Sequence, residues 1–253
     1  MATVDFDVRE NIAYVYFNRP ERYNAFSREL LQEFIDTMRD LSKDENLIAV
    51  VLGGKGKGFS SGVDLEELLH LESVEEARSF ALLLEEASEA LFRFPRPVVA
   101  AIHGVALGGA LGFAAAADIR VVRKDAKLGF PAVKLGAILP ATCTVYVESL
   151  IGRGRTAELT MTGRIFDGNE AYRIGLAEYA EEEQSFEDRI NQITESLKEA
   201  TTLALHMTKK TVNYAASLLL EQAKLNAADN FAFLSQTPQW QRRMKGFSAK
   251  KKK

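Results

Sequence analysis

The strongest constraint on the fold is a pattern that occurs twice, in which a short buried strand leads through a glycine-rich turn into a helix. "AVVLGG" at 49–54 and "VVAAI" at 98–102 are short, apolar and rich in β-branched residues, which is typical of buried strands. The first continues into "GGKGKGFSSGVD" and a helix beginning at Asp64, and the second into "HGVALGGALG" and a helix of small residues. Two such units predict parallel strands joined by crossover connections, and therefore an α/β core.

Other periodicities extend this core. Alternation over 4–8, followed by the apolar run 12–17, predicts a hairpin. Apolar residues at helical spacing predict helices over 27–42, with Ser27 as N-cap, and over 75–94, ended by Pro95 and Pro97. Two more short strands are predicted at 119–122 and 127–130. From Ala141 onward the strand signals stop, and the segments predicted as helices are 144–152, 156–163, 169–177, 187–198 and 203–234.

This pattern divides the chain into a predicted core, residues 1–198, and a helical carboxyl-terminal region, residues 199–253, expected to serve oligomerisation or to cover the active site. The acidic stretch 180–185 is the sole linker candidate.

Composition excludes several classes of protein. A net charge of −3 provides no basic surface for nucleic acid, and we expect the run Lys250–Lys253 to be a solvated tail. The single cysteine, Cys143, excludes an internal disulfide, and the histidines lack metal-ligand spacing, so no metal site is expected. No segment has the length of a membrane span or the pattern of a signal peptide, which predicts a cytoplasmic protein without membrane contact. The three histidines are His70, His103 and His206.

The glycine-rich segments do not match nucleotide-binding motifs. A phosphate loop requires Gly-Lys followed by Ser or Thr, whereas Lys57 is followed by Gly58. A dinucleotide fingerprint is also lacking. Instead, Gly109 and Val63 both stand where a loop passes into a helix, so their backbone N–H groups are open to an approaching group. If both converge on one carbonyl oxygen, they form an oxyanion hole, favoured further by the positive end of the helix at Gly109. The alternative is that the glycines serve only close helix packing.

At these residues the sequence resembles the crotonase superfamily, the enoyl-CoA hydratase and isomerase family. The resemblance covers nearly the whole chain and rests on several motifs in the right order. These are "NRPERYNAFSREL", "AVVLGGKGKGFSSGVDLEEL", "RPVVAAIHGVALGGALG", "ADIRVVRKDAKLGFPAVKLGAILP" and "LTMTGRIFDGNEAYRIGLA". It implies a crotonase-like spiral of strand-strand-helix units with a helical carboxyl-terminal region, homotrimers that commonly pair into hexamers, and an acyl-CoA thioester substrate. Coenzyme A is then part of the substrate, and no separate cofactor is expected.

The resemblance also assigns residues. It places the two oxyanion donors at Val63 and Gly109. The residues that it places along the substrate are Ser61, Asp64, Leu65, Ala132 and Tyr146, with Arg22 or Lys55 meeting phosphate or pantetheine groups.

Two departures from the family pattern concern the catalytic acids. The positions where a hydratase of the family carries its two glutamates hold Gly112 and Ala132, and neither side chain moves a proton. The additional acid of dienoyl isomerases, expected near Pro140, is also absent. The leading expectation remains double-bond isomerisation, slightly ahead of hydration.

Three explanations of the missing acids stay open. The acid has moved to the long helix, to one of Glu85, Glu86 or Glu89, of which only one is expected to point inward; related dehalogenases place a catalytic side chain near Glu85. Alternatively, the enzyme is a decarboxylase-type lyase that needs no strong base and has polar contacts from Thr142, Cys143 or Tyr146. Lastly, the protein has lost the base of an isomerase, or binds acyl-CoA without turnover.

Overall fold

A six-stranded sheet in the order β1-β2-β3-β4-β6-β9 forms the centre of the structure, a computed structural model. It describes residues 2–250, except for the side chains of residues 219, 221–222 and 247–250. Of the expected tail Lys250–Lys253, residues 251–253 lie outside the described residues, and Lys250 is the last residue of α10. β1 pairs antiparallel with β2, as the predicted hairpin, and the other strands run parallel. The strands are β1 (Val4–Arg9), β2 (Ile12–Phe17), β3 (Ala49–Gly54), β4 (Val98–Ile102), β6 (Ile119–Arg123) and β9 (Tyr179–Glu181).

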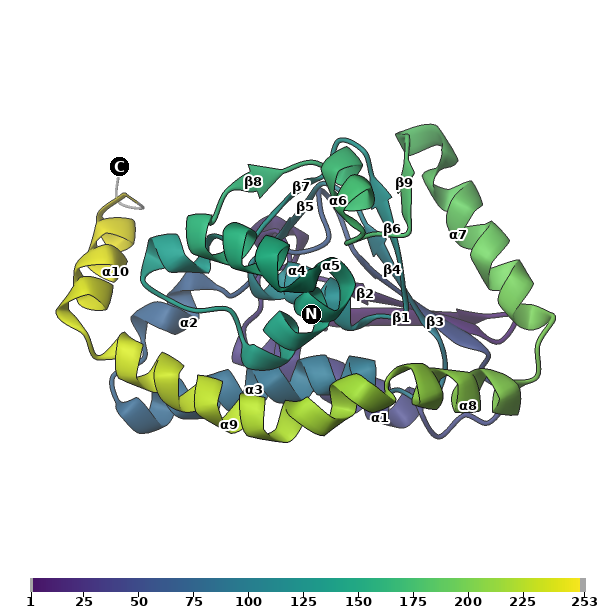
Figure 1. Ribbon diagram of the computed structural model, residues 1–253, viewed down its shortest axis with the longest axis horizontal. Coiled ribbons are helices and arrows are strands. Elements are labelled where there is room, and N and C mark those ends of the chain that lie inside the picture. Colours follow the sequence, from purple (N-terminus) through teal and green to yellow (C-terminus); the bar gives the residue numbers. More distant parts are fainter. Residues whose placement is uncertain (1, 251–253) are drawn as a thin grey trace.

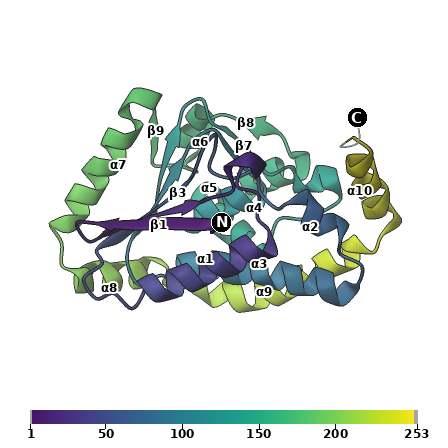
Figure 2. The same cartoon turned by 180° about the vertical axis from the view of Figure 1, so that it is seen from behind.

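Both faces of this sheet are covered, which explains why its central strands are continuously apolar. Along β3, Val50 and Leu52 point to the larger core, which includes residues of α1 (Arg28–Leu41), α3 (Val74–Phe92) and α4 (Gly109–Ala116). Val51 on the same strand points to a smaller core closed by Phe186 and Ile190 of α7 (Glu183–Lys198). Figures 1 and 2 show α7 apart from the helices of the larger core.

A second, three-stranded sheet consists of β5 (Val105–Leu107), β7 (Lys127–Gly129) and β8 (Ile165–Phe166). Ser60, after β3, extends it by a parallel bridge to Ala106. The chain therefore passes three times from the large sheet through the small one into a helical segment: first into α2 (Leu65–Leu69) and α3, then into α4, then into the 3-10 helix η2 (Pro131–Leu135) and α5 (Ala141–Thr162). The predicted α/β fold class is confirmed.

Of the remaining helices, α6 (Gly168–Ile174) follows the segment predicted over 169–177, and α8 (Thr202–Val212) and α9 (Tyr214–Ser235) follow the stretch predicted over 203–234. η1 (Pro20–Arg22) and α10 (Pro238–Lys250) have no predicted counterpart. The two helices predicted over 144–163 correspond to the two parts of α5, which a kink with non-helical backbone angles at Gly152 separates. α9 lies along α3 and also contacts α5 (Figures 1 and 2). Among the described residues, no helix is long and apolar enough to cross a membrane.

Two expectations about the second half of the chain are wrong. Strands do not stop at Ala141, because β8 and β9 follow it, but their two and three residues are too few for alternation to show. The stretch 180–185 is not a linker: it completes β9 and begins α7, and Glu181 pairs with Arg189 of α7 at 2.7 Å.

Candidate active site

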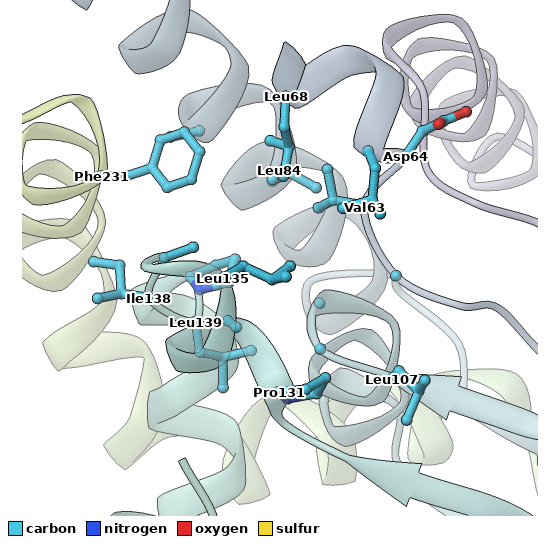
Figure 3. Close-up of a pocket in the computed structure, with 18 of the residues that line it drawn as sticks. Val63, Asp64, Leu68, Leu84, Leu107, Pro131, Leu135, Ile138, Leu139 and Phe231 are labelled. Carbon is cyan, nitrogen blue, oxygen red and sulfur yellow. The ribbon is translucent and has the colours of Figure 1, made fainter. Parts of the chain in front are cut away.

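A largely apolar cavity of about 480 Å³ opens where α2, α3, α4, the η2 segment and α9 meet. This volume lies within the range of small-molecule sites. Figure 3 shows Leu84, Leu135 and Phe231 around the cavity, from three segments far apart in the sequence. The other large apolar lining residues are Val63, Leu65, Leu68, Leu107, Ile138 and Leu139.

The peptide bond between Gly62 and Val63 has a fixed orientation. Its carbonyl oxygen accepts a hydrogen bond from the Phe26 N–H at 2.8 Å. The peptide is trans, so the Val63 N–H points in the opposite direction, away from Phe26. Within the described part of the chain, this N–H donates no hydrogen bond.

The peptide bond between Gly108 and Gly109 is fixed by the first turn of α4. Its carbonyl oxygen accepts from the Gly112 N–H at 3.2 Å, so the Gly109 N–H points out of the helix end. It donates no hydrogen bond to any described residue either. The helix dipole favours negative charge at this position.

The two peptides lie side by side because their strands do. Ser60 accepts a hydrogen bond from the Leu107 N–H at 3.2 Å. A Cβ added at Gly62 would lie 3.8 Å from the nitrogen of Gly109, and one added at Gly109 would lie 4.0 Å from Cγ2 of Val63. Gly62 has φ +90°, and its added Cβ would lie only 2.5 Å from the Leu107 carbonyl oxygen, so only glycine permits this approach. The structure thus brings both predicted donors to one end of the cavity.

Glu85 brings a carboxylate to the same cavity. The side chain projects from α3 and the residue is 1% exposed. Oε1 accepts from the Ala141 N–H at 2.8 Å, and Oε2 accepts from the Thr142 N–H at 3.0 Å and from the Thr142 hydroxyl. The carboxylate therefore caps α5, whose own N-cap residue, Pro140, provides no side-chain hydrogen bond. Burial raises the pKa of Glu85, although the hydrogen bonds from Thr142 and Ala141 oppose this rise.

Comparison with known proteins adds to this geometry. The sequence profile described as Enoyl-CoA hydratase/isomerase matches residues 7–253. The chain belongs to the enoyl-CoA hydratase/isomerase family. It is 31% identical over 237 residues to a putative enoyl-CoA hydratase of Thermus thermophilus, covering 92% of this chain and 89% of the relative. The crystal structure of an enoyl-CoA hydratase from Bacillus halodurans superposes with a TM-score of 0.90 at 24% identity, over 96% of this chain and 99% of that one.

Family membership alone does not determine the reaction. A 4-chlorobenzoyl coenzyme A dehalogenase of an Arthrobacter species is 30% identical, over 95% of this chain and 88% of its own length. Relatives with names as different as hydratase and dehalogenase thus match this family member over similar lengths. The reaction therefore has to be inferred from the side chains that line the cavity.

The first family position for a catalytic glutamate, Gly112, is filled from another helix. A Cβ added there would lie 2.5 Å from Sγ of Cys143 and closer still to its Cβ. The thiol of Cys143 on α5 is fully buried, and burial raises its pKa. A carboxylate at position 112 is therefore incompatible with Cys143 in this place. Ala132, at the second position, lines the cavity with its small side chain.

The long helix α3 corrects another expectation, because two of its three candidate glutamates are buried. Besides Glu85, Glu89 is buried, at 8% exposure, while Glu86 is exposed. Glu89 is paired with Arg93 and with Lys224 of α9, each at 2.8 Å, and does not line the cavity. Burial would raise the pKa of Glu89, but the hydrogen bonds from Lys224 and Arg93 outweigh it and lower that pKa. The sequence shows only the apolar face of α3, not that α5 and α9 cover its glutamates as well.

Five of the residues predicted along the substrate line the cavity: Arg22, Ser61, Asp64, Leu65 and Ala132. The carboxylate of Asp64 is engaged elsewhere, because it caps α2 and pairs with Arg19 at 3.0 Å. In Figure 3 it points away from the cavity. Lys55 is not among the lining residues and pairs with Asp5 at 3.0 Å.

Tyr146 corrects the prediction of a substrate contact. It is not among the residues lining the cavity, and its ring stacks on Phe92 with centroids 4.7 Å apart. Its buried hydroxyl has no hydrogen-bond partner in the described structure, and burial raises its pKa. The cavity is contacted instead by Pro140, the residue directly before α5.

The histidines have backbone partners. His103 Nε2 lies 3.1 Å from the Gly56 carbonyl oxygen, His70 Nδ1 2.7 Å from that of Glu66, and His206 Nδ1 2.9 Å from that of Pro95. Over the described residues, no group of three or more His, Cys, Asp or Glu side chains has a metal-binding arrangement.

Sequence reasoning missed the outer wall of the cavity. Ala227 and Phe231 of α9 line it, as do Ile138 and Leu139 after η2. Helical periodicity over 203–234 indicates an apolar face on that helix. It contains no signal for what the face covers.

Proposed function

We propose that the protein isomerises the double bond of an enoyl-CoA thioester, with Val63 and Gly109 as oxyanion donors and Glu85 as the single acid and base. The supporting observation is that a buried carboxylate with a raised pKa lines the same apolar cavity as two backbone N–H groups that have no partner among the described residues. Asp64, the other carboxylate among the lining residues, is paired with Arg19. One carboxylate is sufficient for this reaction, since a proton leaves one carbon and returns to another.

The proposed mechanism is a 1,3 proton transfer. The carboxylate of Glu85 removes the proton at C2 of a 3-enoyl thioester, and the electron pair passes to the thioester oxygen held by Val63 and Gly109. The carboxylic acid of Glu85 then returns the proton to C4, which gives the 2-enoyl thioester. No water, metal or redox cofactor takes part. Each oxyanion donor contributes about 100- to 1000-fold in rate in comparable sites.

The mouth of the cavity provides one contact for the CoA portion. Arg22, in η1, is the only cation among the lining residues, and its guanidinium is 3.0 Å from a carboxylate oxygen of Glu66. We assign Arg22 to a phosphate or pantetheine group, with Ser61 and Leu65 beside the pantetheine. Hydration is less favoured than isomerisation because it needs a second group to activate water. A decarboxylase is disfavoured because a substrate carboxylate would lie near ionised Glu85.

Binding of acyl-CoA without turnover is the second candidate. It is favoured by one observation: both oxygens of Glu85 are engaged in capping α5, which is a sufficient structural reason for this carboxylate.

The two candidates are separated by assaying a 3-enoyl-CoA and crotonyl-CoA spectrophotometrically with the wild type, Glu85→Gln and Glu86→Gln. Glu86→Gln is the matched control, since it makes the same change on the exposed face of α3. We expect Glu85→Gln to lower kcat for isomerisation by about 100- to 10,000-fold, with unchanged acyl-CoA affinity by calorimetry. Full activity in Glu85→Gln refutes the assignment of the base. Tight binding by a wild type that turns over neither substrate favours the second candidate.

We also propose that the chain forms a homotrimer or a pair of trimers. α8 and α9 expose large apolar side chains, which are Leu203, Met207, Val212, Leu218 and Phe233. Sedimentation velocity tests this directly, and a monomer at micromolar concentration refutes it.

A further inference from the structure

The Ser60 hydroxyl joins the two segments that form one half of the oxyanion hole. Ser60 is fully buried and is not among the residues lining the cavity. Its Oγ donates to the Asn24 carbonyl oxygen at 2.7 Å and accepts from the Gly62 N–H at 3.1 Å. Both directions are fixed, because a carbonyl oxygen only accepts and a backbone N–H only donates.

This hydroxyl controls the orientation of the peptide next to it. Gly62 has φ +90°, and as a glycine it has no side chain whose contacts could hold this conformation in place. Its N–H is held by Ser60 and its carbonyl oxygen by the Phe26 N–H, so both flanks of the residue before Val63 are fixed. The direction of the Val63 N–H follows from these two contacts.

The backbone of Ser60 connects to the other half of the hole. Its N–H donates to the Val105 carbonyl oxygen at 3.0 Å, and its carbonyl oxygen accepts from the Leu107 N–H at 3.2 Å. Leu107 directly precedes the peptide that presents Gly109. The hydrogen bonds of Ser60 therefore reach the segments of both donors. Its side chain binds Gly62, next to Val63, and its main chain binds Leu107, next to the Gly108–Gly109 peptide.

From these contacts we propose that Ser60 is a positioning residue of the oxyanion hole, whose hydroxyl sets the angle at which the Val63 N–H meets the thioester oxygen. This inference rests on the proposed function, because it requires that an acyl thioester is polarised there. Removing the hydroxyl leaves the Gly62 N–H without its acceptor, so Gly62 keeps only the bond from the Phe26 N–H and the angle of the Val63 N–H is less tightly fixed. Displacements of about 1 Å in such sites cost on the order of 100-fold in rate.

The test compares Ser60→Ala with Ser235→Ala. Ser235 on α9 is a close match: it is buried, its hydroxyl donates to the Ala232 carbonyl oxygen at 2.7 Å, and it accepts from Gln236 Nε2 at 3.1 Å, away from the hole. We expect Ser60→Ala to lower kcat about 10- to 100-fold while KM changes less than about threefold. Ser235→Ala is expected to leave both constants unchanged. An equal change in both variants, or a loss confined to KM, overturns the proposal.

A spectroscopic measurement separates positioning from folding. A chromophoric arylacryloyl-CoA absorbs at longer wavelength when its carbonyl is polarised by hydrogen bonds, so its bound spectrum reports on the hole itself. We expect a red shift with the wild type, a smaller one with Ser60→Ala, and an intermediate one with Ser60→Cys, which keeps a weaker donor and acceptor. Ser60→Cys also provides the result if the alanine variant does not fold. A wild-type shift retained in both Ser60 variants refutes the role of Ser60 alone, whereas a bound wild-type spectrum without any shift refutes the oxyanion hole and this inference together.

Discussion

Replacing Gly62 with alanine tests whether the close approach of two backbone segments forms the site. At φ +90° an alanine is strained, which costs about 1–3 kcal/mol. The new Cβ would also lie 2.5 Å from the Leu107 carbonyl oxygen, and relieving this overlap costs about 1–3 kcal/mol more. We therefore expect Gly62→Ala to lose roughly 2–6 kcal/mol of unfolding free energy. Because relief requires the two segments to separate, we expect kcat to fall at least about 100-fold.

Gly152 is the matched control. Its φ of +74° is also positive, but an added Cβ has no atom within 4 Å, and the residue is exposed on α5. Gly152→Ala should therefore lose only the strain of about 1–3 kcal/mol and keep its activity. Urea unfolding and steady-state kinetics measure both effects. The reasoning fails if Gly62→Ala is no less stable than Gly152→Ala, or if it folds and keeps kcat within about threefold of the wild type.

Three further predictions concern buried polar groups. Glu85 has to be ionised to accept a proton, and burial raises its pKa above the ordinary 4.5, so kcat/KM should rise with pH through a limb above that value. Thr142→Val removes a hydrogen-bond donor to the carboxylate and should move this limb to higher pH. A limb that does not move contradicts the assignment of Glu85 as the base. Tyr146→Phe removes a buried hydroxyl without a partner in the described structure, so it should raise the free energy of unfolding by about 1 kcal/mol, measured by thermal unfolding, and leave kcat unchanged. A drop in kcat would instead support the predicted contact between Tyr146 and the substrate. Lys209 and Asp118 form a buried ion pair at 2.7 Å, so Lys209→Met should lower the free energy of unfolding in urea by about 3–5 kcal/mol. Adding Asp118→Asn to this variant should recover part of the loss. A Lys209→Met variant as stable as the wild type would show that the pair is dispensable.

Local patterns predicted the elements that build the hole. The β-branched runs at 49–54 and 98–102 and the glycines after them are short-range signals, and they placed Val63 and Gly109 at loop-to-helix junctions. Local patterns also predicted one strand of the small sheet, at 127–130, but not the pairing that holds these junctions together. β5 and β8 have three and two residues, and the contact at Ser60 is a single bridge, so no periodicity reveals them.

The remaining parts of the site depend on long-range packing. Glu85 belongs to a helix with acidic residues on more than one side, and its burial follows from α5 beginning directly above it. Similarly, nothing near Gly112 indicates that Cys143, thirty-one positions later, fills the space of a longer side chain. The sequence predicted a member of this family that lacks the usual catalytic acids. Only the packing of α3 against α5 distinguished Glu85 from the neighbouring glutamates.

The contribution of α9 to the cavity wall has a consequence for biosynthesis. Ala227 and Phe231 line the cavity together with residues that all precede position 141 among the described lining residues. Because α9 begins at Tyr214, it is synthesised after every other described segment that lines the cavity. A chain that ended before α9 would therefore lack this wall of the cavity and the helix that packs along α3.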